Sequence, residues 1–209
     1  MSQTIFAKNV TLETLSETFG LNQSEDQSQF QEWQSGLSTI SEAEQQALDR
    51  IKSNFKNLGR DRSLSKEAVK MVVLSPLLDL TGFYQPPFKI VTEPSIELLE
   101  EDEGTLVKGN IDVLVILKQL WVLVIESQQS DFSLNKGIPQ ALAYMLAEPT
   151  ARPTFGLITN GSDFIFLKLS RQPSPQYILS KVFSLLNPGN DLIDVLRVLK
   201  HLAKLIQRP

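Results

Sequence analysis

Two apolar runs lie next to each other in the middle of the chain with only a short polar turn between them. They are Ile111–Leu117 and Leu120–Ile125, and the turn is Lys118-Gln119. Continuous apolar runs of this length are typical of strands that are buried on both faces, and so short a polar link predicts a hairpin. The sequence therefore has to fold around a sheet that is covered on both sides.

Acidic side chains interrupt this apolar pattern at both of its ends. Asp112 lies where the first strand begins and Glu126 where the second ends, and Gln128 follows one side-chain alternation later. Carboxylates are rarely buried unless they are paired or bind a metal ion. A structural hairpin has no use for these two acids, so we expect them to carry the chemistry of the protein.

The turn of the hairpin decides whether the two acids lie on one face of the sheet. A two-residue turn would set Asp112 opposite Ile125, away from Glu126, whereas a three-residue connection at Lys118–Leu120 would set Asp112 opposite Glu126. We therefore predict the three-residue connection, or a β-bulge with the same effect. Two converging carboxylates repel unless a cation lies between them, and Mg²⁺ suits such oxygen ligands.

The rest of the chain alternates helical and strand patterns around this hairpin. Ser65 begins an amphipathic helix that Pro76 interrupts and Gly82 ends, and further helices are predicted over 139–147 and 191–207. Residues 88–98 predict a strand that is broken or bulged at Pro94, and 155–159 and 164–169 predict a second hairpin. The predicted fold class is α/β (α+β), with a mixed central sheet flanked by helices. Residues 1–60 predict a helical N-terminal extension and 61–209 the core.

Composition and charge exclude several classes of protein. The chain has 209 residues, no cysteine and a formal net charge of −4. It therefore has no disulfide framework, no thiolate nucleophile and no cysteine-based zinc site, and it is not basic all over. No apolar run reaches ~18 residues, which a membrane-spanning helix needs, and no signal-peptide pattern is present. We expect a cytoplasmic protein.

One stretch of the chain carries a local excess of positive charge. Between residues 50 and 70 only Asp61 and Glu67 are acidic, whereas the basic residues are Arg50, Lys52, Lys56, Arg60, Arg62, Lys66 and Lys70. A solvated helix face and a surface that contacts phosphates explain this excess equally well. Glu67 lies in the first turn of the predicted helix, where a carboxylate interacts favourably with the helix dipole.

The acids and their neighbours resemble the core motif of the PD-(D/E)xK nuclease superfamily. In that motif an acidic residue on one strand is followed by E-x-K on the next strand, here Asp112 and then Glu126-Ser127-Gln128. Glu67 matches a further acid on the preceding helix, and Gln140 and Tyr144 match a Q-x-x-x-Y pattern on the following one. Residues 65–169 are similar to the N-terminal nuclease domain of type I restriction enzyme restriction subunits and to stand-alone cyanobacterial relatives.

This resemblance implies hydrolysis of DNA phosphodiester bonds with Mg²⁺ or Mn²⁺. It implies that Asp112 and Glu126 hold the metal ion, with Glu67 contributing directly or through water, and that Gln140 and Tyr144 shape the site or contact the nucleic acid. It also implies DNA, restriction-modification subunits and a second copy of the chain as partners. The residues expected to contact nucleic acid are Lys56, Arg60, Arg62, Lys66, Lys70 and Lys136.

The chain departs from the motif at one catalytic position, because Gln128 stands where the superfamily has lysine. Glutamine can orient a water molecule but brings no positive charge. Lys136 and Lys108 are the candidates for a lysine that has moved. The alternative function is a catalytically impaired module that binds DNA or a protein partner.

Overall fold

A computed structural model of the protein describes all residues except 1–2, 27–30, 100–103, 118–119, 151 and 208–209. Its larger sheet has the strand order β2-β10-β9-β8-β7-β6-β3, and β11 pairs with β9. These strands are β2 (Asn22–Gln23), β3 (Phe88–Thr92), β6 (Val113–Leu117), β7 (Leu120–Ser127), β8 (Thr154–Thr159), β9 (Asp163–Ser170), β10 (Gln176–Leu179) and β11 (Phe183–Ser184). The pairs β7–β8 and β10–β2 are parallel and the others antiparallel, so the predicted mixed sheet is confirmed.

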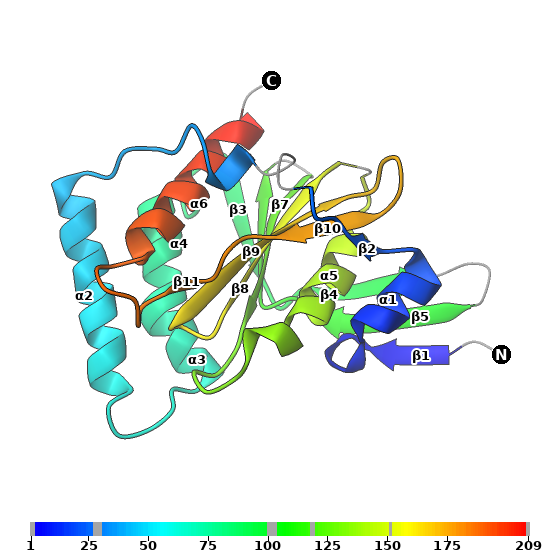
Figure 1. Ribbon diagram of the computed structural model, residues 1–209, viewed down its shortest axis with the longest axis horizontal. Coiled ribbons are helices and arrows are strands. Elements are labelled where there is room, and N and C mark those ends of the chain that lie inside the picture. Colours follow the sequence, from blue (N-terminus) through cyan, green and yellow to red (C-terminus); the bar gives the residue numbers. More distant parts are fainter. Residues whose placement is uncertain (1–2, 27–30, 100–103, 118–119, 151, 208–209) are drawn as a thin grey trace.

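Helices cover the larger sheet on both faces (Figure 1). On one face lie α2 (Glu42–Leu58), α3 (Lys66–Val69), α4 (Ser75–Thr81) and α6 (Leu192–Gln207). The other face carries α1 (Leu12–Phe19), α5 (Ile138–Leu146) and a smaller sheet. Alternate residues of the central strands enter two separate hydrophobic cores, such as Val115 on one face and Leu114 on the other. Burial on both faces is the reason why these strands are apolar without interruption.

The smaller sheet has the order β1-β5-β4 and includes a strand from the start of the chain. Its strands are β1 (Gln3–Phe6), β4 (Ser95–Leu99) and β5 (Thr105–Asn110), with β1 parallel to β5. Because β1 and β2 belong to sheets, the prediction that residues 1–60 are only helical is corrected. The sequence did not predict β1 because Gln3–Phe6 is a short edge strand, which shows neither a continuous apolar run nor a clear alternation.

The chain passes between the two sheets at two adjacent points. It leaves β3 at Glu93-Pro94 to begin β4, which confirms the break predicted at Pro94, and it returns from β5 to β6 at Ile111-Asp112. The two crossings are hydrogen-bonded to each other, since the Glu93 N–H donates to the Asp112 carbonyl (3.3 Å) and the Ile111 N–H to the Pro94 carbonyl (3.1 Å). Asp112 is thus fixed at a junction of the fold.

The helical stretch from Lys66 to Thr81 widens in its middle, just before Pro76. Between α3 and α4 lies a π-helical turn at Lys70–Leu74, in which the Ser75 N–H donates to the Lys70 carbonyl. Proline lacks an N–H and its ring would crowd the carbonyl four residues earlier, so a wider turn accommodates it. The interruption predicted at Pro76 is therefore a π-turn within a continuous helix. In the described part of the chain, no helix is both long and apolar enough to span a membrane.

Candidate active site

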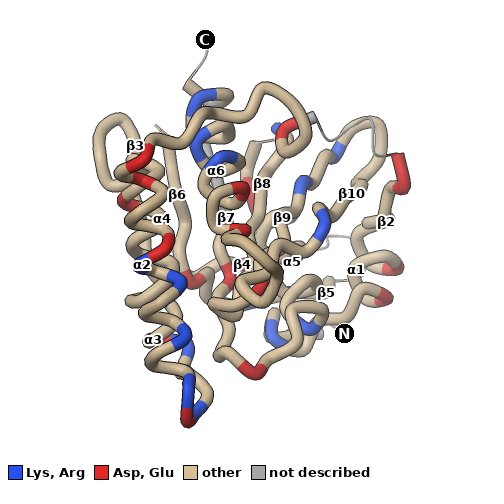
Figure 2. The backbone as a smooth tube through the Cα atoms, turned by 60° about the vertical axis from the view of Figure 1, so that its left-hand side comes forward, with Lys and Arg blue, Asp and Glu red and all other residues tan. Residues whose placement is uncertain are grey.

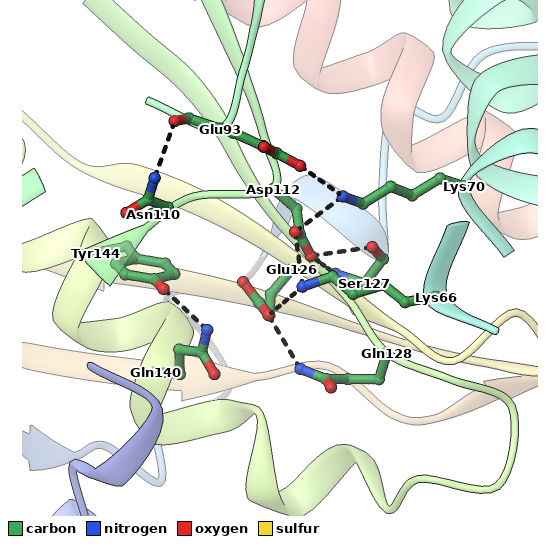
Figure 3. Close-up of polar contacts among 10 residues, drawn as sticks. All are labelled: Lys66, Lys70, Glu93, Asn110, Asp112, Glu126, Ser127, Gln128, Gln140 and Tyr144. Carbon is green, nitrogen blue, oxygen red and sulfur yellow. Dashed lines mark hydrogen bonds and ion pairs between the residues drawn. The ribbon is translucent and has the colours of Figure 1, made fainter. Parts of the chain in front are cut away.

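Asp112 is buried beside the first residue of β6 and uses both of its carboxylate oxygens. Its Oδ2 accepts hydrogen bonds from the Ser127 N–H (2.8 Å) and hydroxyl (3.0 Å), and these fix the side chain against β7. Its Oδ1 forms ion pairs with the Nζ atoms of Lys66 (2.7 Å) and Lys70 (3.0 Å). Figure 3 shows the Asp112 carboxylate between the strand and these two lysines.

Glu126 is fully buried in β7, with 0% of its surface exposed. Its Oε1 accepts a hydrogen bond from the Gln128 amide (3.0 Å) and lies 3.5 Å from Lys66 Nζ, so Lys66 contacts both acids. Its Oε2 has no hydrogen-bond partner among the described residues. Burial, with the Asp112 carboxylate adding to it, raises the pKa of Glu126 to about 8, although Lys66 acts in the opposite direction.

A β-bulge brings these two acids together. Leu117 pairs with Leu120 and Ile116 with Trp121, but the next pairs are Val115 with Leu123 and Val113 with Ile125. The extra residue in β7 shifts the register by one, so that Val113 pairs with Ile125. Asp112 precedes Val113 and Glu126 follows Ile125, so the shift sets the two acids opposite each other. The predicted bulge is confirmed, whereas the three-residue connection is wrong because Leu117 and Leu120 are paired. The side chains of Lys118 and Gln119 lie outside the described residues.

Lys66 and Lys70 reach the site from the start of the helix that precedes the sheet. They are four residues apart and therefore project from the same helical face, with Ser65 capping the helix through its hydroxyl (3.2 Å to the Ala68 N–H). Burial alone would lower the pKa of Lys66, but the Glu126 and Asp112 carboxylates outweigh it and raise the pKa above its ordinary value. The sequence offered a solvated helix face or a phosphate-contacting surface for them. Their i,i+4 spacing puts them on one helical face, but only the packing of the helix against the sheet brings that face to the acids.

The structure does not bring Glu67 to Asp112 and Glu126, which corrects the prediction that it is a third ligand. Glu67 is fully exposed in the first turn of α3, where backbone N–H groups and the Ser65 hydroxyl lower its pKa. Consecutive side chains on a helix point about 100° apart, so Lys66 and Glu67 cannot both face the site. The helix-dipole role that the sequence also offered fits this position.

Neither candidate for a displaced lysine contacts the acids. Lys108 forms an ion pair with Glu97 on the smaller sheet (2.8 Å), and Lys136 lies over the ring of Phe132 (5.6 Å to its centroid). The positive charge at the site comes from α3 instead. Of the other predicted nucleic-acid contacts, Lys56 and Arg62 line one surface cavity, and Arg60 lies near them in the loop that joins α2 to α3. Figure 2 shows these basic positions gathered at the end of α2 and along α3.

Gln140 and Tyr144 lie beside the acids on α5, one turn apart as predicted. The Gln140 amide donates to the Tyr144 hydroxyl (2.8 Å), and both side chains point toward Glu126 and Gln128 (Figure 3). Burial and the nearby Glu126 carboxylate raise the pKa of Tyr144 to about 12, so the phenol stays protonated. Gly109 permits this placement, because a Cβ there would lie only 2.8 Å from Tyr144 Cε1.

The acidic groups of the site fit a magnesium ion better than a zinc ion. Among the described residues no group of three or more His, Cys, Asp or Glu is arranged to hold a metal, and the two acids that meet at Lys66 are Asp112 and Glu126. Mg²⁺ commonly binds proteins through one or two carboxylates and keeps several waters. The unpartnered Oε2 of Glu126 is an oxygen that such an ion would satisfy.

Comparison with known proteins gives a family match and likenesses to solved structures. The family model described as the type I restriction enzyme R protein N terminus matches residues 6–174. Among solved structures, a fragment named as an HsdR subunit of a type I restriction enzyme from Vibrio vulnificus YJ016 has 19% sequence identity and a TM-score of 0.40. That likeness covers 54% of this chain and 24% of the other, so it spans about a quarter of the solved protein. No curated protein matches the chain.

Proposed function

Because the chain belongs to the family of type I restriction enzyme R protein N termini, we propose that it is a metal-dependent nuclease that hydrolyses DNA phosphodiester bonds. One observation carries this proposal: Asp112 and Glu126 are buried side by side and converge on one cationic group, while an oxygen of Glu126 has no partner among the described residues. Buried polar atoms are nearly always hydrogen-bonded, and an exception of this kind points to a ligand or a catalytic role.

The ion that these acids would hold is Mg²⁺ or Mn²⁺. Asp112 and Glu126 would supply oxygen ligands of the kind that magnesium prefers, which leave room for waters and a phosphate group. When bound, the ion lowers the pKa of a water molecule and stabilises negative charge on the phosphate. Glu67 is not part of this set of direct ligands, because it faces solvent in the first turn of α3.

The protein's own side chains hold the acids in place for this chemistry. The Ser127 N–H and hydroxyl orient Asp112, and the Gln128 amide orients Glu126. Gln128 therefore does part of what a lysine would do at this position, since it positions a carboxylate, but it adds no charge. Gln140 and Tyr144 form the wall of the site next to Glu126, where the phenol and amide are hydrogen-bond donors for a bound nucleotide.

The expected partners follow from the same proposal. DNA would approach over Lys56, Arg60 and Arg62, at the end of α2 and in the loop that leads to α3, and Lys136, beside Phe132, would also contact it. Cleavage of both strands of a duplex usually takes two sites, which a homodimer would provide. Subunits of a restriction-modification system are further partners, and the cytoplasm, where DNA is found in bacteria, is the expected location.

A second candidate function rests on the lysines that neutralise the acids. Lys66 and Lys70 compensate Asp112 and Glu126 without a metal ion, and Gln128 replaces the motif lysine. A protein with this arrangement would bind DNA or a protein partner through its basic surface and cleave nothing.

A cleavage assay separates the two functions. The protein is incubated with plasmid and with single-stranded DNA plus Mg²⁺ or Mn²⁺, beside the variants Asp112→Asn and Glu126→Gln. We expect cleavage that falls by at least about a hundredfold in each variant, as for other residues that stabilise a transition state. Glu97→Gln, which removes an exposed carboxylate of the smaller sheet, is the matched control and should cleave normally. Cleavage that persists in both site variants excludes this site, and a wild-type protein that neither cleaves nor binds metal supports the binding module.

A further inference from the structure

We propose that Lys66 is an exchangeable counter-ion of the metal site and a catalytic residue of the proposed nuclease. Its ammonium group holds Asp112 and Glu126 together until a divalent cation takes its place. The displaced ammonium then contacts the phosphate and provides the positive charge that Gln128 lacks. This inference rests on the proposed function, but its first step, the exchange of cations, can be measured without DNA.

The position of Lys66 Nζ is the first argument for exchange. It lies 2.7 Å from Asp112 Oδ1 and 3.5 Å from Glu126 Oε1, so it bridges the two carboxylates from which a divalent ion would be bound (Figure 3). Two positive groups cannot share so small a space, because their repulsion in a partly buried site is strong. A bound divalent ion must therefore push the ammonium away from at least one of the acids.

The surroundings of Lys66 allow this movement. Its side chain is 35% exposed, whereas those of Asp112 and Glu126 are 5% and 1% exposed, so the lysine lies on the solvent side of the acids. A lysine side chain is a flexible four-carbon stem that can swing outward without a change in the backbone. The ammonium thus stands between the acids and the solvent from which a phosphate group would enter.

The base of Lys66 is fixed, so the displaced ammonium stays close to the two acids. The Leu64 N–H donates to the Ser130 hydroxyl (2.7 Å), and the Ser130 N–H donates to the Leu64 carbonyl (3.0 Å). These bonds tie the start of α3 to the segment that follows β7, two residues beyond Gln128. Lys66 and Gln128 therefore lie on two segments that are held together.

Lys70 provides the matched comparison. It carries the same charge from the same helical face and lies 3.0 Å from Asp112 Oδ1, but its second partner is the exposed Glu93 (3.8 Å) rather than Glu126. Lys70 thus adds positive potential near the site without standing between the two acids. If general electrostatics were the whole explanation, removal of either lysine would have a similar effect on metal binding.

The test is Mn²⁺ binding to the full chain without DNA, measured by calorimetry and by the loss of the free-ion signal in electron paramagnetic resonance. We expect Lys66→Met to bind Mn²⁺ about tenfold more tightly than the wild type, since a charge next to the ion has been removed. Lys70→Met should bind it only slightly more tightly, and Lys108→Met as the wild type does. Equal gains for Lys66→Met and Lys70→Met, or weaker binding by Lys66→Met, would overturn the exchange.

A second measurement follows Lys66 in the unaltered protein. The rate at which acetic anhydride modifies Lys66 is determined by mass spectrometry with and without Mg²⁺, and Lys108 serves as the internal reference. An ammonium paired with two acids is protected, so we expect faster modification of Lys66 when Mg²⁺ is present. An unchanged rate under saturating Mg²⁺ would contradict displacement even if the methionine variant failed to fold.

Cleavage tests the catalytic step. Lys66→Met should cleave DNA about a hundredfold more slowly although it binds Mn²⁺ more tightly, and Lys66→Arg should recover part of the rate. Tighter binding with undiminished cleavage would show that Lys66 only competes with the metal, which would overturn its catalytic role. A wild type that binds Mn²⁺ but cleaves no DNA would refute the proposed nuclease and this catalytic role together, while the binding data would still decide the exchange.

Discussion

Two buried glutamates of this protein are held in opposite ways. Glu148, which follows α5, has a partner for each oxygen: Arg171 Nη1 for Oε2 (3.4 Å) and the Thr150 hydroxyl for Oε1 (2.8 Å). Glu126 has Gln128 and Lys66 at one oxygen and, among the described residues, no partner at the other. Both glutamates are almost completely shielded from solvent. Burial alone therefore does not distinguish a structural acid from a functional one.

The difference lies in whether the hydrogen bonds around the charge are complete. Arg171 also donates to the backbone carbonyls of Met145, Leu146, Glu148 and Thr150, so it closes the end of α5 as well as pairing with Glu148. A helix end leaves carbonyl groups without partners, and a cation there stabilises them. Glu126, in contrast, keeps an open oxygen next to another carboxylate, which costs folding energy. That cost is expected at a site that is built to bind a ligand.

The largest effect on stability should come from Arg171→Met. Removal of this side chain leaves Glu148 buried without its cation and several carbonyls at the end of α5 without donors, so we expect a loss of about 3–5 kcal/mol in the free energy of unfolding. Urea denaturation followed by circular dichroism measures this loss. Arg197→Met, which removes an exposed ion pair with Asp194 on α6, should change the stability by less than about 1 kcal/mol. Equal effects of the two substitutions would show that the Arg171 network is not structural.

The next largest effect on stability should come from Glu126, and it depends on pH. Its pKa is about 8 in the folded protein against an ordinary value of 4.5, so between these values the folded state binds a proton that the unfolded state has lost. The stability that this proton provides is fully present below pH 4.5 and is lost as the pH rises through 8. Glu126→Gln should remove this loss and become more stable than the wild type by on the order of 3 kcal/mol near pH 8.

The measurement for Glu126→Gln is a series of denaturation curves between pH 5 and 8 in the presence of a chelator, so that no divalent ion compensates the charge. The difference between variant and wild type should widen steadily as the pH rises. Glu97→Gln serves as the control, because this carboxylate is exposed and its replacement should leave the pH profile unchanged. Parallel profiles for wild type and Glu126→Gln would mean that Glu126 ionises normally and that its open oxygen has no energetic consequence.

The sequence predicted the sheet and the two strand acids because both leave local signals. Continuous apolar runs require burial on both faces, and an acid within such a run stands out against them. The same logic required Asp112 and Glu126 to share a face, and a bulge in β7 is how the chain achieves it. The exact turn was not predictable, since a bulge and a longer connection give the same register for the acids.

The partners of those acids were not predictable from local patterns. Lys66 and Lys70 look like any lysines on a solvated helix, and only the packing of α3 against the sheet shows that they point inward. The sequence indicated Glu67 instead, because acidic side chains were expected to bind the metal ion. The strands β1 and β5 were missed for a related reason: they pair with each other across about a hundred residues, so no local pattern links them.

The smallest effect should come from Glu67→Gln, which tests the correction about this residue directly. Glu67 faces solvent and its charge acts on the N-terminus of α3, so its removal should lower the stability only slightly. The dependence of DNA cleavage on Mg²⁺ concentration should be the same as in the wild type, in contrast to Asp112→Asn, which loses a proposed direct ligand. If Glu67→Gln instead needed about ten times more Mg²⁺ for half-maximal cleavage, Glu67 would act on the metal through water. The site would then contain three carboxylates, those of Asp112, Glu126 and Glu67. The unpartnered Oε2 of Glu126 would belong to a larger metal site than Asp112 and Glu126 form by themselves.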